Sequence, residues 1–266
     1  MEQEPDFVRA LLPAGLKPQP GVPLVRIGRG HDGGYLVDRR NLERADLLIS
    51  MGINTDWSFE EQFLAQREVQ LFAYDGSVSA RDFFVEFYTR LALFEPRNAR
   101  LAWQRFAGFR RFFNQTTRVH RCNFVSRDDG MRHISLDTIL NDDVGETRRN
   151  IFFKIDIEGS EYHLLDALLA CADRIEGATI EFHDVDRNMK RILAFVDAFP
   201  LTLCHVHGNN YSVVLDDGTP IVIECSFTRQ PADASKPLKL PHPLDRPCRP
   251  GRPELVIEFS GMHGPN

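Results

Sequence analysis

Apolar runs alternate with amphipathic stretches along most of this chain. Residues 45–54 ("ADLLISMGIN") and 69–75 ("VQLFAYD") are short apolar runs that predict buried strands. Residues 55–68 between them predict a helix, with Asp56 or Ser58 as its N-cap and acidic residues in its first turn. Strand, helix and strand in such close succession are typical of the βαβ unit of a parallel sheet.

The alternation continues in the second half of the chain. It predicts strands at 150–158, 177–185, 201–208 and 220–228, and helices at 160–175 and 187–199. The turn at Asp217-Gly218 predicts that the last two strands form an antiparallel hairpin at the end of the sheet. We therefore expect one α/β domain over residues 1–266, with a mostly parallel sheet whose last strand is antiparallel.

Three segments fall outside this alternation. Residues 1–44 contain a predicted hairpin, with Asp32-Gly33-Gly34 as its tight turn. Residues 230–266 are too rich in proline for regular structure before a strand-like "ELVIEF", and a long loop of this kind often lies across a ligand site. Residues 77–115 form a helical, aromatic-rich insertion that carries seven arginines, at positions 81, 90, 97, 100, 105, 110 and 111.

The insertion has two interpretations. In the first, a pair of helices packs its aromatic side chains on the sheet and leaves the arginines in water. In the second, the insertion is a lid whose arginines meet an anionic substrate.

Composition and charge restrict the classes of partner. A formal net charge of −6 provides no general attraction to nucleic acid or to an anionic membrane. No apolar run reaches the length of a membrane span and the first residues do not resemble a signal peptide, so we expect a cytoplasmic protein. The five cysteines are widely spaced without a CxxC pair, which argues against disulfides and thiolate zinc sites.

Ligands of doubly wound sheets bind where the strands end, so we inspected these positions for chemistry. The first strand ends at Gly52, and Asp75 ends the second, 75 − 52 = 23 positions later. This is close to the spacing at which an acidic residue binds the ribose of a nucleoside, although no GxGxxG motif is present. A plain turn at Gly52 and an Asp75 that caps "YDGS" are the structural alternatives.

The strand at 150–158 ends in a cluster of charge. Lys154, Asp156 and Glu158 alternate and should face the cleft together, followed by Glu161 in the first turn of the next helix. Such carboxylates need a cation nearby, which can be Lys154, a metal or a sulfonium. A structural Lys–Asp pair with a helix cap is the alternative.

The next two strands end in "IEFHDVD" and "HVHGNN". They should bring further polar side chains to the same edge, namely Glu181, His183, His205, His207 and Asn209. Together these residues suit a divalent metal or a general base, although each histidine alone can equally be a packing residue.

The run "FKIDIEGSEYHLLDAL" resembles the signature of FkbM-like S-adenosylmethionine-dependent methyltransferases, with its Lys-Ile-Asp-(Val/Ile)-Glu-Gly-x-Glu pattern at residues 154–161. "SLDTIL", "RIGRGHDGGYLVD", "SMGINTDWSFEEQF", "FAYD", "HVHGNNY" and "LPHPLDRPCRPGRPELVIEF" are also similar, so the resemblance runs from Leu24 to Phe259 and is weakest in the insertion. It implies a Rossmann-like class I methyltransferase sheet with Gly52 near the methionine of the cofactor and Asp75 on its ribose. The full set of cofactor-binding residues that we expect is Gly52, Asn54, Asp75, Gly76, Asp32, Gly34 and Tyr35.

The resemblance further implies O-methylation of a sugar, glycan or glycosylated metabolite. Asp156 or His183 could be the base that removes the hydroxyl proton, with Lys154 and Glu158 as further catalytic residues. Alternatively, Mg²⁺ held among Asp156, Glu181, His183 and His207 could lower the pKa of the hydroxyl. The arginines of the insertion suggest an anionic acceptor. A homo-oligomer is also compatible with the sequence.

Two other functions are compatible with the same residues. One is a metal-dependent phosphoester or glycan hydrolase that uses Asp156, Glu158, His183 and His207. The other is a non-catalytic ligand-binding module of the same fold, because a fold does not fix a function.

Overall fold

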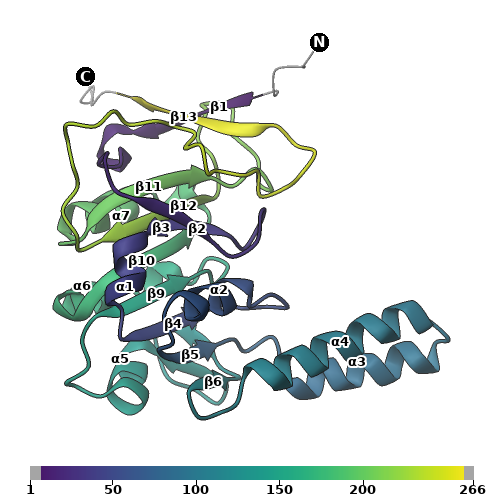
Figure 1. Ribbon diagram of the computed structural model, residues 1–266. Coiled ribbons are helices and arrows are strands. Elements are labelled where there is room, and N and C mark those ends of the chain that lie inside the picture. The colour runs from purple at the N-terminus through teal and green to yellow at the C-terminus, as the bar shows by residue number, and fades with distance from the viewer. Residues whose placement is uncertain (1–6, 261–266) are drawn as a thin grey trace.

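A central sheet of seven strands organises the computed structural model, which describes residues 7–260 (Figure 1). Across the sheet the order is β11 (Thr202–Gly208), β12 (Ile223–Thr228), β10 (Ile175–Phe182), β9 (Ile151–Ile155), β4 (Leu47–Met51), β5 (Gln70–Tyr74) and β6 (Arg118–Arg121). Only β12 runs antiparallel to its neighbours. The predicted mostly parallel α/β sheet is therefore confirmed, as is the antiparallel pairing of β11 with β12, although β12 lies inside the sheet and β11 forms its edge.

The alternation of side chains along each strand divides the core into two layers. Leu47, Ile49 and Met51 of β4 enter one hydrophobic cluster, while Leu48 enters the other. All five residues of β9 are buried, as expected for a parallel strand covered on both faces. Helix α7 (Val185–Ala198) packs into the first layer, and α2 (Ser58–Gln66) packs into the second.

Two predicted helices differ in detail. The helix expected at 160–175 is broken into a 3₁₀ turn at Glu161–His163, α6 (Leu165–Ala170) and a second 3₁₀ turn at Ala172–Arg174. The N-cap of α2 is Trp57, so the prediction of Asp56 or Ser58 was wrong. Asp56 nevertheless accepts a hydrogen bond from the Ser58 amide, and the expected acidic first turn is present at Glu60 and Glu61.

The predicted hairpin before the main sheet consists of β2 (Leu24–Ile27) and β3 (Tyr35–Asp38), followed by α1 (Arg39–Arg44). Its connection spans residues 28–34, so the tight turn expected at 32–34 is in fact a longer loop. The loop is held against α2, because the Gly28 amide donates to Gln62 and Arg29 pairs with Asp56 at 2.8 Å.

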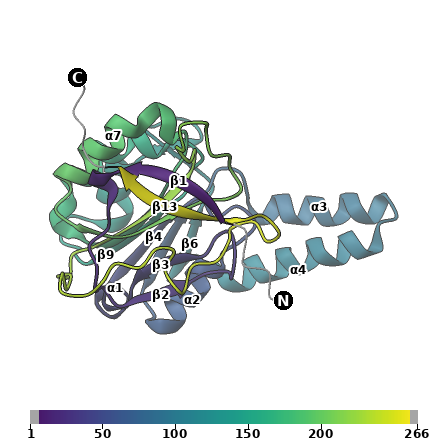
Figure 2. The ribbon, with the colours of Figure 1, turned by 90° about the horizontal axis from the view of Figure 1, so that it is seen from above.

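The remaining elements complete the body. The predicted C-terminal strand is β13 (Glu254–Ser260), which pairs in parallel with β1 (Phe7–Pro13) rather than with the main sheet (Figure 2). Small elements fill the connections, namely a 3₁₀ turn at Ala14–Leu16, β7 (Phe124–Ser126), β8 (His133–Ser135), α5 (Leu136–Thr138) and a π-helical turn at Ile139–Val144. Within the described residues, no helix is both long and apolar enough to cross a membrane.

The insertion forms a helical arm, α3 (Ala80–Ala92) and α4 (Pro96–Phe112), that projects away from the body (Figures 1 and 2). At its root, Phe83, Phe109 and Phe113 surround Trp57, with ring centroids 5.6–6.2 Å away. Farther out two helices alone cannot cover their apolar side chains, and Phe94 at the tip is 92% exposed. The predicted helical pair is confirmed, but only the aromatic residues at its root pack into the core cluster that covers the sheet.

Candidate functional site

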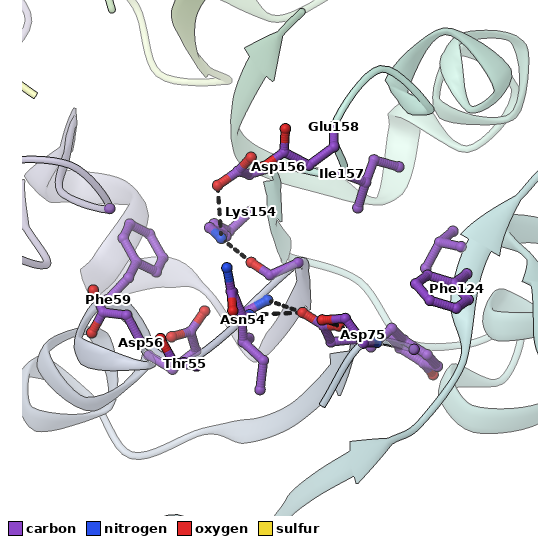
Figure 3. Close-up of a pocket in the computed structure, with 18 of the residues that line it drawn as sticks. Asn54, Thr55, Asp56, Phe59, Asp75, Phe124, Lys154, Asp156, Ile157 and Glu158 are labelled. Atoms are coloured by element: carbon purple, nitrogen blue, oxygen red, sulfur yellow. Dashed lines mark hydrogen bonds and ion pairs between the residues drawn. The ribbon is translucent and has the colours of Figure 1, made fainter. Parts of the chain in front are cut away.

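A cavity of about 370 Å³ opens at the carboxyl ends of β4, β5 and β9 (Figure 3). From β4 the chain continues to β5 on one side of the sheet, and it later returns to β9 on the other side of β4. The cavity therefore lies at the topological switch point of the sheet. Its walls come from the residues that follow these strands, the β2–β3 loop, the start of α2 and the start of β7. No residue of the arm lines it, which contradicts the lid interpretation for this structure.

Gly52 lies in the cavity wall, but the requirement for glycine comes from the fold. Its φ of +79° is in the left-handed region, and a Cβ there would collide with the carbonyl oxygen of Asp156. The backbones of the β4 and β9 ends approach closely, with the Asp156 amide 3.0 Å from the Met51 oxygen. The expected close approach of a ligand is therefore not needed to explain this glycine.

Asp75 faces the same cavity from the end of β5. One carboxylate oxygen accepts hydrogen bonds from the amides of Ile53 and Asn54 at 2.9 and 2.7 Å, and the other accepts from the amide and hydroxyl of Ser77 at 2.7 and 2.5 Å. The structural alternative, a cap of the "YDGS" turn, is thus present. The side chain also reaches the cavity, where a ribose could replace the rotatable Ser77 hydroxyl.

Phe124 forms an aromatic wall that the sequence analysis missed. Its ring lies where a Cβ on Gly76 would collide with it, which explains the glycine at position 76. Figure 3 shows Phe124 beside Asp75 and away from Asp156. The sequence around it, "RVHRCNFVS", has no pattern that separates this residue from a core phenylalanine.

The hairpin residues expected to bind cofactor divide into two groups. Asp32 lines the cavity, and burial, with the charges of Glu224 and Asp156, raises the pKa of its carboxyl group. Gly34 does not line it, because it packs against the Arg29 carbonyl instead. Tyr35 is buried and reaches the site only through its hydroxyl.

Lys154, Asp156 and Glu158 all line the cavity, as predicted, although β9 ends at Ile155 and only Lys154 belongs to the strand. Lys154 is 5% exposed; its ammonium group donates to the Gly52 carbonyl and lies 3.6 Å from Asp156. Burial lowers the pKa of Lys154, but the carboxylates around it, Asp156 first, outweigh this and raise it above its ordinary value. Glu158 has a φ of +55° and its side chain is 85% exposed at the cavity mouth.

The hydroxyl of Tyr35 connects two carboxylates. It lies 3.1 Å from Asp156 Oδ2 and 2.9 Å from Glu181 Oε2, and Asn209 donates to the other oxygen of Glu181. Burial, together with the charges of Asp156 and Glu224, raises the pKa of Glu181 well above its ordinary value. A proton on Glu181 would leave the Tyr35 hydroxyl free to donate to Asp156.

His183 lies behind the mouth rather than in the cavity wall. Its Nδ1 is 2.7 Å from Glu161, and its Nε2 is 3.5 Å from Glu158 and 3.9 Å from Glu181. Burial lowers the pKa of His183, but the hydrogen bond to Glu161 and the nearby carboxylates raise it to about 9. Glu161 also accepts from the amides of Ile157 and Gly159, so it fixes the loop that carries Asp156 and Glu158.

The metal-ligand group expected from the sequence is split in two. Asp156, Glu158 and His183 have donor atoms within 4.8 Å of one another, but His207 belongs to a separate group with Glu224 and Cys248. The expectation that His207 joins Asp156 and His183 was wrong. His205 likewise faces Asp245, at 3.0 Å, instead of the cavity.

Comparisons with known proteins agree with the signature. Residues 88–211 match the model of the methyltransferase FkbM domain, so the match begins inside the arm that the sequence analysis took as least family-like and leaves out Gly52 and Asp75. No curated protein matches the chain.

Solved structures that resemble the chain include a fibrillarin pre-rRNA processing protein from Methanococcus jannaschii (7% identity, TM-score 0.36, 71% of this chain and 68% of the other) and an rRNA methylase from Streptococcus thermophilus (12%, 0.37, 71% and 92%). M. jannaschii TYW2 in complex with AdoMet is a third (9%, 0.33, 74% and 83%). Likeness at this level carries no argument about function.

The strand order provides the independent structural criterion. Numbered along the chain from β4, the seven core strands follow the order 6-7-5-4-1-2-3 with strand 7 antiparallel, as in class I methyltransferases. The match of the FkbM methyltransferase domain around the signature at residues 154–161 supports an FkbM-like, S-adenosylmethionine-dependent methyltransferase.

Proposed function

We propose that the enzyme methylates a hydroxyl oxygen of a neutral sugar, glycan or glycosylated metabolite, with Asp156 as the general base. The observation that carries this proposal is the position of Asp156. It lines the cavity and is partly exposed, while Lys154 and the Tyr35 hydroxyl hold its Oδ2 from the protein side. His183, the other candidate base, does not line the cavity.

The cavity suits S-adenosylmethionine, which when bound supplies the electrophilic methyl group of its sulfonium. Asp75 would hold the ribose and Phe124 would cover the adenine, since an aromatic face and a carboxylate lie side by side there. Asn54 and Gly76 line the same part of the wall, and Gly52 lies between this end and Asp156. The carboxylates of the opposite end favour a cationic sulfonium electrostatically.

The chemical task of the protein is to remove a proton from a poor nucleophile. An acceptor hydroxyl at Asp156 would give its proton to the free Oδ1 as the oxygen attacks the methyl group. Lys154 holds the carboxylate in place through its contacts with Asp156 and Gly52, so orientation is supplied before the acceptor binds.

The residues at the mouth also fit Mg²⁺. Asp156, Glu158 and Nε2 of His183 would hold the ion, and Glu161, which lies 2.7 Å from Nδ1, would orient the imidazole. The ion would lower the pKa of the acceptor hydroxyl, which is the chemistry that it supplies there.

The charge of the cavity favours a neutral acceptor over the anionic one that the arginines suggested. The arm does not reach the cavity. The cavity wall contains two cationic side chains, Arg29 and Lys154. The carboxylates in the wall are more numerous: Asp32, Asp56, Glu60, Asp75, Asp156 and Glu158. Carboxylates accept hydrogen bonds from adjacent sugar hydroxyls, whereas they repel phosphate.

The test measures binding and turnover separately. Calorimetric titration with S-adenosylhomocysteine, with and without Mg²⁺, should show binding, and absence of binding in both conditions would overturn the proposal. In an assay that detects S-adenosylhomocysteine release with a panel of glycans, Asp156→Asn should lower turnover by about 10²- to 10⁴-fold at nearly unchanged cofactor affinity. Full turnover in this variant would exclude Asp156 as the base.

A further inference from the structure

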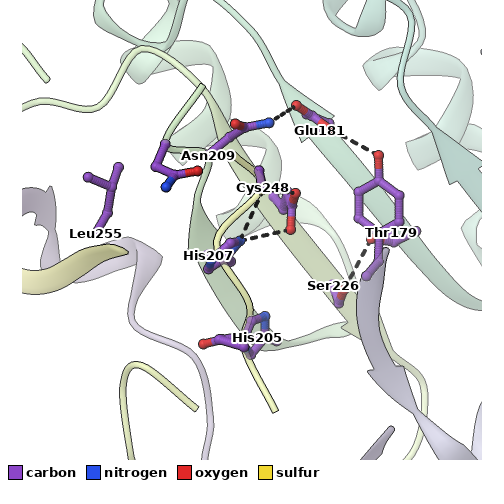
Figure 4. Close-up of polar contacts among 12 residues, drawn as sticks. Thr179, Glu181, His205, His207, Asn209, Ser226, Cys248 and Leu255 are labelled. Carbon is purple, nitrogen blue, oxygen red and sulfur yellow. Dashed lines mark hydrogen bonds and ion pairs between the residues drawn. The ribbon is translucent and has the colours of Figure 1, made fainter. Parts of the chain in front are cut away.

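A second polar cluster lies at the β11–β12 edge of the sheet, outside the cavity wall (Figure 4). His207 on β11 is directly opposite Glu224 on β12 in the antiparallel register, so their side chains are neighbours on one face. Cys248 reaches them from the proline-rich segment before β13. All three side chains are almost completely buried.

The donor atoms have the spacing of metal ligands. His207 Nδ1 is 3.0 Å from Glu224 Oε2, Cys248 Sγ is 3.2 Å from Glu224 Oε1, and Sγ is 3.9 Å from Nδ1. Ordinary zinc bond lengths in tetrahedral geometry separate such atoms by about 3.3 to 3.7 Å. A small adjustment of side chains would therefore place all three around one ion.

The other nitrogen of His207 supports this arrangement. Glu254 Oε1 lies 3.0 Å from Nε2, where it can accept the imidazole N–H and leave the Nδ1 lone pair directed at Glu224. Carboxylates hold metal-binding histidines in this way. In this tautomer Nδ1 and Glu224 are two acceptors at hydrogen-bond distance, which requires a proton or a metal cation between them.

The sulfur distinguishes between these two cations. With a proton between His207 and Glu224, Cys248 stays a neutral thiol that donates to Glu224 Oε1, whereas a metal would bind it as a thiolate. Thiolate, imidazole and carboxylate are all zinc ligands. One Zn²⁺ would neutralise the Cys248 thiolate and the Glu224 carboxylate, and the Glu254 carboxylate would accept the imidazole N–H of His207.

We propose that His207 Nδ1, the Glu224 carboxylate and the Cys248 thiolate bind one Zn²⁺, with water as the fourth ligand. Binding would release the thiol proton and the proton between His207 and Glu224 to solvent. The site would fasten the proline-rich segment to the sheet edge. The Cys248 carbonyl also accepts from the amide of Asp32, so the same point supports a loop of the cofactor cavity.

The first test is metal content. Protein purified with zinc in the growth medium and without chelator should contain about one zinc per chain by mass spectrometry of the metal, and Cys248→Ala should contain almost none. Cys204→Ala is the matched control, because Cys204 is also buried but bonds to the Ser226 carbonyl instead. The proposal would be overturned by a wild-type zinc content no higher than that of Cys248→Ala, or by an equal loss of zinc in Cys204→Ala.

Two further readouts separate a metal from a proton. Co²⁺ added to metal-free protein should produce a thiolate-to-cobalt charge-transfer absorption that is absent in Cys248→Ala. Glu254→Ala keeps all three ligands and should weaken zinc affinity by about 10- to 100-fold. A chelator that leaves the unfolding temperature of the wild type unchanged would contradict the structural role. These measurements do not depend on methyl transfer, so either proposal can fail alone.

Discussion

Asp75 gives the most direct test of how the cofactor is held. Asp75→Asn removes the charge while keeping the shape of the side chain. The asparagine oxygen can still accept from the Ile53 and Asn54 amides, which the wild-type Oδ2 does at 2.9 and 2.7 Å. Its amide nitrogen then faces the backbone N–H of Ser77, which loses its acceptor.

The magnitude follows from these contacts. A hydrogen bond to a charged group contributes about 1.5–3 kcal/mol. If ribose hydroxyls bind the carboxylate, losing that interaction weakens S-adenosylhomocysteine binding by about 10- to 150-fold. Leaving the Ser77 amide without a partner should lower the free energy of unfolding by only about 1–2 kcal/mol, so the variant stays folded.

The assay is calorimetric titration with S-adenosylhomocysteine, with denaturant unfolding to confirm that the variant is folded. Ser77→Ala is the control, because it removes one donor to Asp75 without changing the charge. We expect its dissociation constant to stay within about threefold of wild type. Unchanged affinity in Asp75→Asn would show that Asp75 only caps the turn and would refute the ribose assignment.

Three other predictions concern the fold around the site. Burial lowers the pKa of His120 from 6.5 to about 4. Between these two pH values His120 is protonated in the unfolded chain but neutral in the folded protein, so the free energy of unfolding falls as the pH drops from about 6.5 to about 4. Between pH 7 and pH 5 this amounts to about 2 kcal/mol, and urea unfolding of His120→Gln should lack that part of the pH dependence. Arg97→Glu combined with Arg100→Glu should leave the affinity for S-adenosylhomocysteine within about twofold of wild type, since the arm does not line the cavity. A larger loss of affinity would support the interpretation of the arm as a lid. Gly52→Ala should destabilise the protein by more than about 3 kcal/mol in the same unfolding assay, because its Cβ would collide with the Asp156 carbonyl, and a wild-type midpoint would contradict that collision.

The sequence allowed the sheet to be predicted because its strands are buried on both faces. A run such as Ile151–Ile155, flanked by amphipathic stretches, has few alternatives to a central parallel strand. The insertion of β12 between β10 and β11 was not predicted, because strand order depends on contacts between distant segments. The outward direction of the arm was missed for the same reason: its helical period is clear, but the pattern does not say which neighbour covers it.

The residues that follow the central parallel strands were predicted to lie at the site, whereas residues placed there by contacts between distant segments were missed. Gly52, Asp75 and Asp156 end three adjacent parallel strands, and they do meet in one cavity. Phe124 begins β7, a three-residue strand that pairs with β8 outside the main sheet and is too short to show a period in the sequence. His207 follows the expected alternation, yet the partner opposite it in the sheet is Glu224, a residue that the sequence analysis did not consider.

The signature run at 154–161 can now be separated into roles. Lys154 is bound to the Gly52 carbonyl and to Asp156, and Glu161 is occupied by the amides of its own loop and by His183. These contacts hold the loop in place, with Glu161 Oε1 making all of its hydrogen bonds while Oε2 is buried without a partner in the described part of the chain. Asp156 and Glu158 are the carboxylates of the run that line the cavity. Substitution of Lys154 or Glu161 should therefore affect stability and catalysis together, whereas Asp156→Asn should affect catalysis at nearly constant stability.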